Sequence, residues 1–247
     1  MTLPKITVIT VVLNNAQTIE RTILSVLNQE YPNLEYIVVD GVSTDGTLDV
    51  IKKYEHKLHQ WISESDTGIY DAMNKGIRMS TGDVVGLINA DDWMAENSLC
   101  VIADHYSKNK NAILCGNVFL WNNSEKGKLK KSDLKHLKRE MTIWHPGVFV
   151  PLEIYRRIGA FNTQYKILGD YEFILRAYLN GETFLMLAHT TANMSVGGVS
   201  NSLIKKSMQE SFDIKQKLLG KALSNHFYYA YYLLKYLTII EIKKIIY

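Results

Sequence analysis

The chain has 247 residues, of which 47% are hydrophobic and 21% are charged, and its formal net charge is +3. This composition is that of a globular protein, and the length allows one large domain or a domain with an appendage. The small net charge argues against a nucleic-acid partner. The two cysteines, Cys100 and Cys115, do not have a metal-ligand spacing, so we expect no disulfide and a cytoplasmic location.

The sequence shows no signal for secretion or for a membrane-spanning helix. Residues 1–5 lead directly into an apolar segment, without the basic, apolar and cleavage regions of a signal peptide. The longest apolar stretch, residues 222–240, is interrupted by Asn225, His226 and Lys235. A spanning helix is therefore not expected there.

The first hundred residues alternate between strand and helix patterns. Apolar, β-branched runs predict strands at residues 6–13, 36–39, 61–62 and 84–88. Apolar residues at helical spacing predict helices at residues 18–29, 47–54 and 69–79. This alternation predicts an α/β fold with a Rossmann-like, mostly parallel central sheet and right-handed crossovers. Ligands bind such sheets at the carboxyl ends of the strands, where Asp40 and the pair Asp91-Asp92 fall.

The second half is less regular. Further strands are predicted at residues 112–121 and 183–188, an extended stretch at 142–150, and helices at 169–180 and from about 203. Residues 197–200, which read Gly-Gly-Val-Ser, form a predicted flexible turn. We expect a catalytic domain at residues 1–202 and a C-terminal helical appendage at residues 203–247.

The most informative segment runs from Val84 to Asp92, where an apolar strand ends in two adjacent carboxylates. Adjacent like charges raise each other's pKa unless a cation intervenes. Aspartates combined with phosphate oxygens suit Mg²⁺ or Mn²⁺, which indicates chemistry on a phosphorylated substrate. The alternative is that Asp91 or Asp92 caps a helix that begins at about Ala95.

Asp40 also follows an apolar strand and precedes Gly41. Its carboxylate could accept hydrogen bonds from a nucleoside, or it could be an ordinary turn aspartate. The end of the first strand, Leu13 to Ala16, carries no glycine-rich phosphate motif. This argues against a dinucleotide dehydrogenase, a P-loop hydrolase and a nucleotidyltransferase.

Asp170 opens a predicted helix, with Glu172 close by. The helix dipole keeps such a carboxylate ionised, so Asp170 is either a cap or a general base for a sugar hydroxyl. His145 could bind a metal or a phosphate, or it could be a structural histidine. The segment Lys126–Arg139 has seven Lys or Arg and one acid, Asp133. It indicates a solvated loop or a site for anionic lipid or a diphosphate.

Several short motifs occur in a characteristic order. They read TVITVVLN (7–14), SVLNQ (25–29), EYIVVDGVSTDGT (35–47), DTGIYDAMNKGI (66–77), TGD (81–83), HPG (145–147), GDYE (169–172) and GGVS (197–200). In this order they resemble the family 2 glycosyltransferases, and in particular the branch that builds bacterial surface polysaccharides such as colanic acid and O-antigen. The resemblance covers about residues 4–201.

The resemblance implies a GT-A fold and an inverting transfer from a nucleotide-sugar. Asp170 matches the catalytic base, Asp91 the ligand of a divalent metal (Mn²⁺ or Mg²⁺), and Asp40 the residue that binds the nucleoside, expected to be uridine. Further donor-binding positions are Thr10, Asn14, Asp71, Lys75, Asn89 and Ala90, and supporting positions are Asp92, His145 and Glu172.

The chain departs from the family pattern at two of these positions. Asn89 replaces the first aspartate of the D-x-D motif, so it can form a hydrogen bond but carries no charge. Gly169 replaces the glutamate of the usual Glu-Asp pair, although the aspartate is kept as Asp170. These changes leave open an alternative function, a non-catalytic subunit that binds a nucleotide-sugar and acts in assembly.

The expected reaction moves a hexose or an N-acetylhexosamine from a UDP-sugar to a saccharide or a lipid-diphosphate-linked acceptor. Residues 227–247 are rich in Tyr, Leu and Ile and contain lysines, which suits peripheral binding to the inner face of a bacterial membrane. The alternative is a helix that packs on the domain or on a second subunit in a homodimer.

Overall fold

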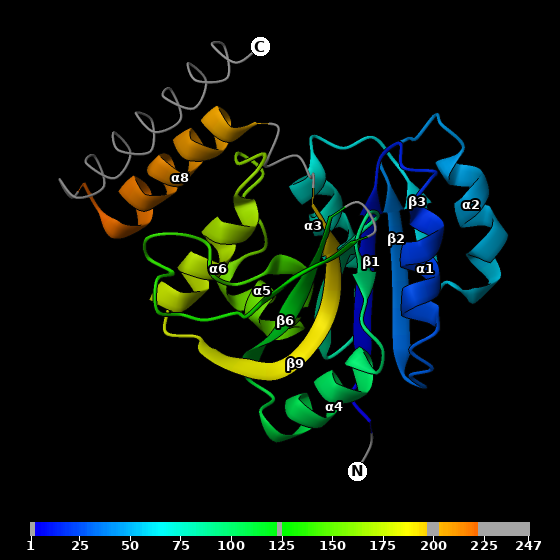
Figure 1. The fold of residues 1–247 in the computed structure, drawn as a ribbon, viewed down its shortest axis with the longest axis horizontal. Coiled ribbons are helices and arrows are strands. Elements are labelled where there is room, and N and C mark those ends of the chain that lie inside the picture. The colour runs from blue at the N-terminus through cyan, green and yellow to red at the C-terminus, as the bar shows by residue number, and fades with distance from the viewer. Residues whose placement is uncertain (1–2, 123–124, 197–202, 222–247) are drawn as a thin grey trace.

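A computed structural model describes residues 3–122, 125–196 and 203–221 (Figure 1). Within these residues nine strands form one sheet in the order β3-β2-β1-β4-β8-β6-β9-β5, and β7 pairs with β6. The strands are β1 (Ile6–Val12), β2 (Leu34–Asp40), β3 (Gln60–Ser63), β4 (Val84–Asn89), β5 (Trp93–Met94), β6 (Ala112–Asn122), β7 (Glu125–Lys130), β8 (Val148–Pro151) and β9 (Thr183–Ser195). The helices are α1 (Ile19–Leu27), α2 (Thr47–Tyr54), α3 (Ile69–Met79), α4 (Ser98–Lys108), α5 (Leu152–Ile158), α6 (Gly169–Leu179) and α8 (Ile204–Leu219), with short 3₁₀ turns η1 (Glu55–Lys57) and η2 (His145–Gly147).

The N-terminal half of the sheet is parallel, as predicted. β3, β2, β1 and β4 run in the same direction, with β1 between β2 and β4. The second half mixes directions, because β8 is antiparallel to both β4 and β6, whereas β6 is parallel to β9. The predicted α/β architecture is therefore confirmed, but the sheet is mixed and not mostly parallel, because β5, β7 and β8 pair antiparallel with their neighbours.

Alternation along the strands gives the sheet two apolar faces. In β1, Val8 and Val12 belong to one core, which packs under α1, α2 and α4, whereas Ile9 and Val11 belong to the other, which packs under α3, α5 and α6. Successive side chains of a strand point to opposite faces, which explains why fully apolar strands serve both cores.

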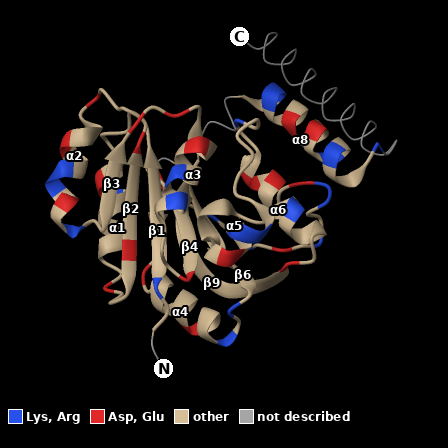
Figure 2. Cartoon of the chain, turned by 180° about the vertical axis from the view of Figure 1, so that it is seen from behind, with Lys and Arg blue, Asp and Glu red and all other residues tan. Residues whose placement is uncertain are grey.

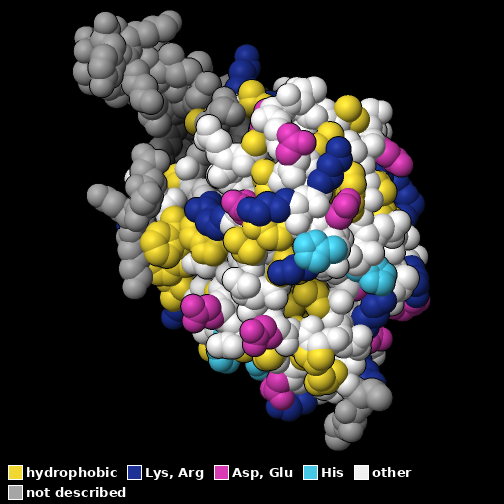
Figure 3. Space-filling view, turned by 90° about the vertical axis from the view of Figure 1, so that its right-hand side faces the viewer, with side chains coloured by type: hydrophobic (Ala, Val, Ile, Leu, Met, Phe, Trp, Pro, Cys, Tyr) yellow, Lys and Arg dark blue, Asp and Glu magenta, His cyan; other side chains and the backbone are white. Residues whose placement is uncertain are grey.

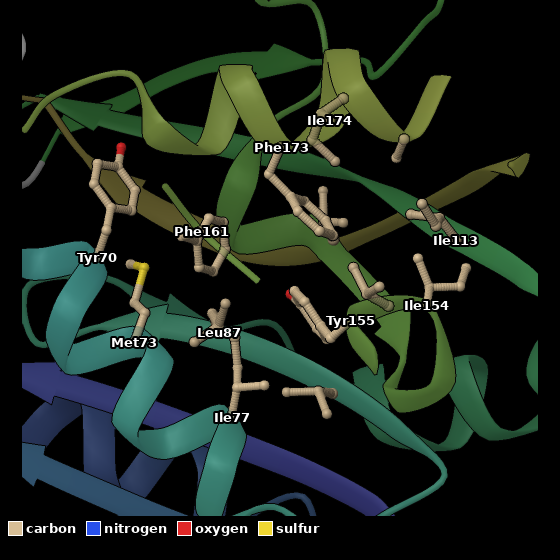
Figure 4. Packing of buried hydrophobic residues seen from close by; sticks show 14 of the residues in the cluster. Tyr70, Met73, Ile77, Leu87, Ile113, Ile154, Tyr155, Phe161, Phe173 and Ile174 are labelled. Atoms are coloured by element: carbon tan, nitrogen blue, oxygen red, sulfur yellow. The ribbon is translucent and has the colours of Figure 1, made fainter. Parts of the chain in front are cut away.

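An aromatic cluster fills the core on the α3 and α6 side (Figure 4). Tyr70 of α3 contacts Phe161 at 5.5 Å between ring centroids, Phe161 contacts Phe173 of α6 at 5.2 Å, and Phe173 stacks on Tyr155 of α5 at 4.8 Å. Such pairs contribute roughly 0.5–1.5 kcal/mol each beyond their burial. The cluster fixes α6 relative to α3.

Helix α8 lies beside α6 and carries both acidic and basic side chains (Figure 2). Ile214 of α8 is fully buried in the core on this side of the sheet. This helix begins the predicted appendage, whose remaining residues 222–247 lie outside the described part of the chain, as does the predicted turn at 197–200.

Three local predictions were wrong. The helix expected from about Ala95 begins at Ser98 with Asn97 as its N-cap, so neither Asp91 nor Asp92 caps it. The basic segment is not wholly a loop, because its first residues form β7 and pair with β6. Strand β9 continues to Ser195 instead of ending at residue 188, because it follows β6 through irregularities in register.

On the face of the molecule seen in Figure 3, basic and acidic side chains are interspersed. No helix within residues 3–122, 125–196 and 203–221 has the length and apolar character needed to cross a membrane.

Candidate active site

The carboxyl ends of β2, β1 and β4 form the rim on which the predicted donor residues lie. Asp40 ends β2 opposite Val12 of β1, and Asn89 ends β4 opposite Val11 of β1. Since neighbouring strands lie about 5 Å apart, the backbones of Asp40 and Asn89 are roughly 10 Å apart across β1. The parallel topology thus brings both predicted residues to one edge.

Asp40 is completely buried, and its two carboxylate oxygens have different surroundings. Oδ2 accepts hydrogen bonds from the backbone N–H groups of Val42 and Ser43, at 3.0 Å each, and from the hydroxyl of Ser63 at 2.6 Å. Oδ1 is buried without a partner. Asp40 is therefore a turn aspartate through one oxygen, while its other oxygen is buried with no hydrogen-bond partner among the described residues.

The turn after Asp40 is strained. Val42 has φ = +67°, in the left-handed region that a β-branched residue rarely adopts. The two bonds from the Asp40 carboxylate hold this conformation. Strain of this kind persists where surrounding contacts determine it and is frequent at ligand sites.

The acidic pair follows β4 directly. Asp92 is 2% exposed and accepts a hydrogen bond at 3.1 Å from the backbone N–H of Ser195, at the end of β9. Burial, and then the charge of Asp91, raise the pKa of Asp92 well above its usual value, although hydrogen bonding from Ser195 and Asn89 and the charge of Arg21 oppose this. Burial also raises the pKa of Asp91. Burial is therefore the main cause for both residues, and the mutual repulsion expected from the sequence is secondary.

Arg21 of α1 is a basic neighbour of the acidic pair that the sequence did not reveal. Its Nη2 donates to the backbone oxygen of Asp91 at 2.7 Å, and its guanidinium lies 3.8 Å above the ring of Trp93. The charge of Arg21 opposes the rise that burial causes in the pKa of Asp91 and Asp92. The pair is thus partly neutralised by the protein itself.

Asp170 lies in the first turn of α6 and accepts two hydrogen bonds through Oδ1. The donors are the hydroxyl of Tyr70 at 3.0 Å and the backbone N–H of Tyr171 at 2.8 Å. The N-cap of α6 is Leu168, so the cap alternative for Asp170 was wrong. Burial, and then the charge of Asp170, raise the pKa of Tyr70 well above its usual value, so Tyr70 keeps its proton and remains a donor.

The structure gives a reason for the glycine that precedes Asp170. A Cβ atom at position 169 would meet ring atoms of Tyr70 at 2.8–2.9 Å, closer than real Cβ contacts. The close approach of Tyr70 to the start of α6 therefore requires glycine there. A glutamate, which the family pattern has at this position, would displace the Tyr70 ring that contacts Asp170.

His145 lies in η2 and lines a small pocket together with Asp170. The pocket volume is about 10 Å³, which is room for about one water, and Tyr155, Phe161 and Phe173 form part of its apolar wall. The Nε2 atom of His145 is buried without a partner. Burial lowers the pKa of His145, opposed by the charge of Asp170, so the imidazole is neutral at pH 7.

Other predicted donor residues make contacts within the protein. Asp71 accepts from the backbone N–H of Thr67 at 3.0 Å, and Lys75 donates to the backbone oxygen of Ser65 at 2.7 Å. Both side chains thus stabilise the segment between β3 and α3. Glu172 is buried and forms an ion pair with Arg176 at 2.9 Å.

Three more predicted residues differ in their positions. Asn14 is exposed beside the rim, and its Oδ1 accepts from the backbone N–H of Thr44 at 2.8 Å. The backbone oxygen of Ala90 accepts a hydrogen bond from the hydroxyl of Thr22 on α1. Thr10 is fully buried in the middle of β1, where its hydroxyl lies 3.0 Å from that of Tyr36. The fold does not bring the Thr10 side chain to the rim.

The described residues contain no group of three or more His, Cys, Asp or Glu side chains that could hold a metal by themselves. Asp91 nevertheless offers a hard oxygen ligand at the rim. Magnesium commonly binds through one or two carboxylates together with substrate phosphates. The residues therefore fit a cation that is shared with a diphosphate, and they do not form a separate protein site.

Comparison with known proteins establishes the family. The model for "Glycosyl transferase family 2" matches residues 7–173. The chain is 26% identical over 231 residues to a PGL/p-HBAD biosynthesis glycosyltransferase of Mycobacterium bovis, with 88% of both chains covered. It is 36% identical over 99 residues to the putative teichuronic acid biosynthesis glycosyltransferase TuaG of Bacillus subtilis, with 39% of both covered. The protein belongs to glycosyltransferase family 2.

Solved structures show the same fold. S. aureus TarS aligns with a TM-score of 0.68 at 19% identity, covering 90% of this chain but only 43% of TarS. A mannosyltransferase from Pyrobaculum calidifontis, in complex with GDP-Man and Mn²⁺, aligns with a TM-score of 0.67 at 21% identity, covering 91% of this chain and 67% of the other. These likenesses confirm the expected GT-A fold.

Proposed function

We propose that this protein is an inverting, metal-dependent hexosyltransferase. It moves a hexose or an N-acetylhexosamine from a UDP-sugar to a saccharide or lipid-linked acceptor during synthesis of a bacterial surface polysaccharide. The observation that carries the proposal concerns buried polar atoms. Among the buried side-chain nitrogen and oxygen atoms of the described residues, those without a hydrogen-bond partner are Asp40 Oδ1, Asn89 Oδ1 and His145 Nε2, and all three belong to predicted site residues. Unpaired buried polar atoms are costly, which supports a ligand as their partner.

Asp40 and Asn89 lie on either side of β1 at the carboxyl ends of the strands, where α/β sheets bind ligands. In this proposal Asp40 Oδ1 accepts a hydrogen bond from the nucleoside, and Asn89 contacts the ribose. Asp91 holds a Mn²⁺ or Mg²⁺ ion, which when bound neutralises charge on the diphosphate. Four further residues are proposed to act in donor binding, either by contacting the nucleotide-sugar or by shaping the loops around it. They are Asn14, Asp71, Lys75 and Ala90.

Asp170 acts as the general base. Its carboxylate takes the proton from an acceptor hydroxyl, and that oxygen attacks the anomeric carbon as the bond to the diphosphate oxygen breaks. Nucleoside diphosphate leaves and the anomeric configuration inverts in a single displacement. His145, neutral and beside Asp170, orients the acceptor, while Asp92 fixes the acidic motif against β9.

Two comparisons support the substrate classes. TarS has been crystallised in complex with UDP-GlcNAc, and this structure aligns with a TM-score of 0.65 at 18% identity. One relative is named as a PGL/p-HBAD biosynthesis glycosyltransferase and another as a putative teichuronic acid biosynthesis glycosyltransferase. Binding at the inner membrane surface through residues 227–247 stays a prediction, because those residues lie outside the described part of the chain.

The donor is identified by thermal unfolding with a panel of nucleotide-sugars in the presence of MnCl₂. A bound donor stabilises the folded state in proportion to the logarithm of its concentration over its dissociation constant. We expect one UDP-sugar to raise the melting temperature more than the others. That sugar then serves in an assay for release of UDP.

Two variants test the assigned roles. Asp170→Asn should abolish turnover while it leaves donor binding intact, and near-normal turnover in this variant would show that Asp170 is not the base. Asp91→Asn should remove the effect of Mn²⁺ on donor binding. The alternative of a non-catalytic assembly subunit predicts donor binding without UDP release in the wild-type protein.

A further inference from the structure

Glu210 of α8 is a buried carboxylate, 9% exposed, that binds three consecutive backbone N–H groups. Its Oε1 accepts from the backbone N–H of Lys166 at 2.8 Å, and its Oε2 accepts from those of Ile167 and Leu168 at 2.9 Å each. Glu210 lies beyond residues 7–173, which match the family model. The common family pattern therefore does not account for it.

Two of these N–H groups, those of Lys166 and Ile167, directly precede α6, and the third belongs to the residue at its start, Leu168. Leu168 is the N-cap of this helix and makes no side-chain capping bond. The first N–H groups of a helix need acceptors, and a negative charge there is stabilised by the helix dipole. Glu210, 42–44 residues away in sequence, supplies an acceptor for the N-cap N–H of Leu168 and a negative charge beside the start of the helix.

The segment that Glu210 holds is connected directly to Asp170. The backbone oxygen of Ile167 accepts from the hydroxyl of Tyr70 at 2.7 Å, and the same hydroxyl lies 3.0 Å from Asp170 Oδ1. A shift of residues 166–168 would therefore move the Tyr70 hydroxyl, the start of α6 and the Asp170 carboxylate together.

The loop between α5 and α6, residues 159–168, is also fixed at its other points. Asn74 of α3 donates to the backbone oxygen of Phe161 and accepts from its N–H, at 2.8 and 2.9 Å. Arg176 of α6 donates to the backbone oxygens of Gly159 and Ala160. Glu210 completes this set at the end of the loop nearest to Asp170.

We propose that Glu210 is a positioning residue for Asp170 and that α8 is in this way a functional part of the catalytic unit. The inference rests on the proposed role of Asp170 as the base. Glu210 holds residues 166–168 by three hydrogen bonds, and these residues set the place of Asp170 relative to the acceptor hydroxyl. A displacement of about 1 Å at such a group can lower a rate a hundredfold.

The test compares Glu210→Gln with Asp213→Asn in the full chain. Glutamine keeps one acceptor oxygen but replaces the other by an amide that cannot accept, so residues 166–168 lose part of their support. Asp213 lies on the same helix and bonds the hydroxyl of Tyr165 in the same loop, at 2.8 Å, and asparagine keeps an acceptor for it. It is thus a matched control.

We expect kcat for UDP release to fall at least about tenfold in Glu210→Gln. The dissociation constant for UDP with MnCl₂, measured by calorimetry, should stay within about twofold, because the donor site lies on the strand rim. Asp213→Asn should match the wild type in both measurements. Glu210→Asp, which keeps the charge on a shorter side chain, should recover part of kcat.

Equal kcat in Glu210→Gln and the wild type would overturn the proposal. An equal loss of kcat in Glu210→Gln and in the control Asp213→Asn would also overturn it. Loss of UDP binding in Glu210→Gln would also overturn it, since that result indicates a general structural role. If Glu210→Gln does not fold, Glu210→Asp alone decides, because it should lower kcat without changing UDP binding. A wild-type protein that releases no UDP would instead contradict the proposed function.

Discussion

The hydroxyl of Tyr70 lies 3.0 Å from Oδ1 of Asp170, although the two residues are 100 positions apart in the sequence. Tyr70 is on α3 and Asp170 is on α6, and the two helices are linked through Phe161, which contacts Tyr70 on one side and Phe173 of α6 on the other. Because burial and the charge of Asp170 raise the pKa of Tyr70, its hydroxyl stays protonated, and its single proton is shared between the Asp170 carboxylate and the backbone oxygen of Ile167. The candidate base on α6 is therefore oriented by a residue of α3, which precedes β4 in the parallel part of the fold.

Replacing Tyr70 by phenylalanine removes the hydroxyl, with its contacts to Asp170 and to the backbone oxygen of Ile167, and keeps the ring. We expect kcat to fall about threefold to tenfold and the free energy of unfolding to fall by about 1–2 kcal/mol, since a typical hydrogen bond contributes about 1 kcal/mol and two contacts are lost. Steady-state UDP release and urea unfolding measure the two effects. Tyr165→Phe, which removes a hydroxyl bonded to Asp213, is the control and should leave kcat unchanged. Unchanged kcat in Tyr70→Phe would mean that this hydroxyl does not orient the base.

The glycine at position 169 should not tolerate a side chain. Its Cβ would meet the Tyr70 ring at 2.8 Å, so Gly169→Ala should lower the free energy of unfolding by about 1–3 kcal/mol, as overpacking does. A double-mutant cycle with Tyr70→Ala isolates the contact, because removal of the ring should abolish most of the cost. An equal cost of Gly169→Ala in both backgrounds would exclude the clash as its cause.

Asp40→Asn should weaken nucleotide binding. The variant keeps an oxygen for the N–H groups of Val42 and Ser43, but the atom that replaces the unpaired Oδ1 can no longer accept a hydrogen bond. A hydrogen bond to a charged group contributes about 1.5–3 kcal/mol, so we expect the dissociation constant for UDP to rise at least about tenfold. Calorimetry measures it, and Asp49→Asn, on the exposed side of α2, should bind like the wild type. Equal affinities in the two variants would remove Asp40 from the donor site.

Stability at low pH should depend on Glu35, which is fully buried on β2. Burial raises its pKa, but hydrogen bonds from Lys5, Thr7 and Thr81 outweigh this and lower the pKa from 4.5 to about 2. A depressed carboxylate pKa stabilises the folded state above the unfolded pKa, and this contribution is lost as the pH falls from 4.5 towards 2. For Glu35, the lowering of the pKa from 4.5 to about 2 corresponds to a contribution of about 3 kcal/mol to the free energy of unfolding.

Glu35→Gln should therefore be less stable than the wild type at pH 7, and the difference should shrink between pH 4.5 and pH 2. Urea unfolding across this range measures it, and Glu96→Gln, at an exposed position, is the control. A stability difference that does not vary with pH would show that the pKa of Glu35 is not depressed in the folded protein.

The periodic segments could be predicted closely from the sequence. The predicted helices at 47–54 and 69–79 coincide with α2 and α3, because their apolar residues repeat at helical spacing and pack on one face. The shared rim of Asp40 and the acidic pair that follows β4 was also predicted from the sequence, since the strand ends of a parallel sheet meet at one edge, and the ends of β2 and β4 do lie on either side of β1. The end of β9 could not be predicted from the sequence, because the extension of this strand to Ser195 depends on its pairing with β6.

The sequence by itself determined the α/β fold and the family, and it singled out Asp40, Asp91 and Asp170 as candidate site residues. It could do so because periodicity and motif order are local properties of the chain. Only the tertiary structure decided how these residues are held. Arg21 beside Asp91, and Tyr70 beside Asp170, are contacts between distant segments. They depend on helix packing against the sheet, which no spacing along the chain records. Gly169 is a further example. In the sequence it is only a departure from the family pattern, but the structure explains it by the Tyr70 ring packed against it.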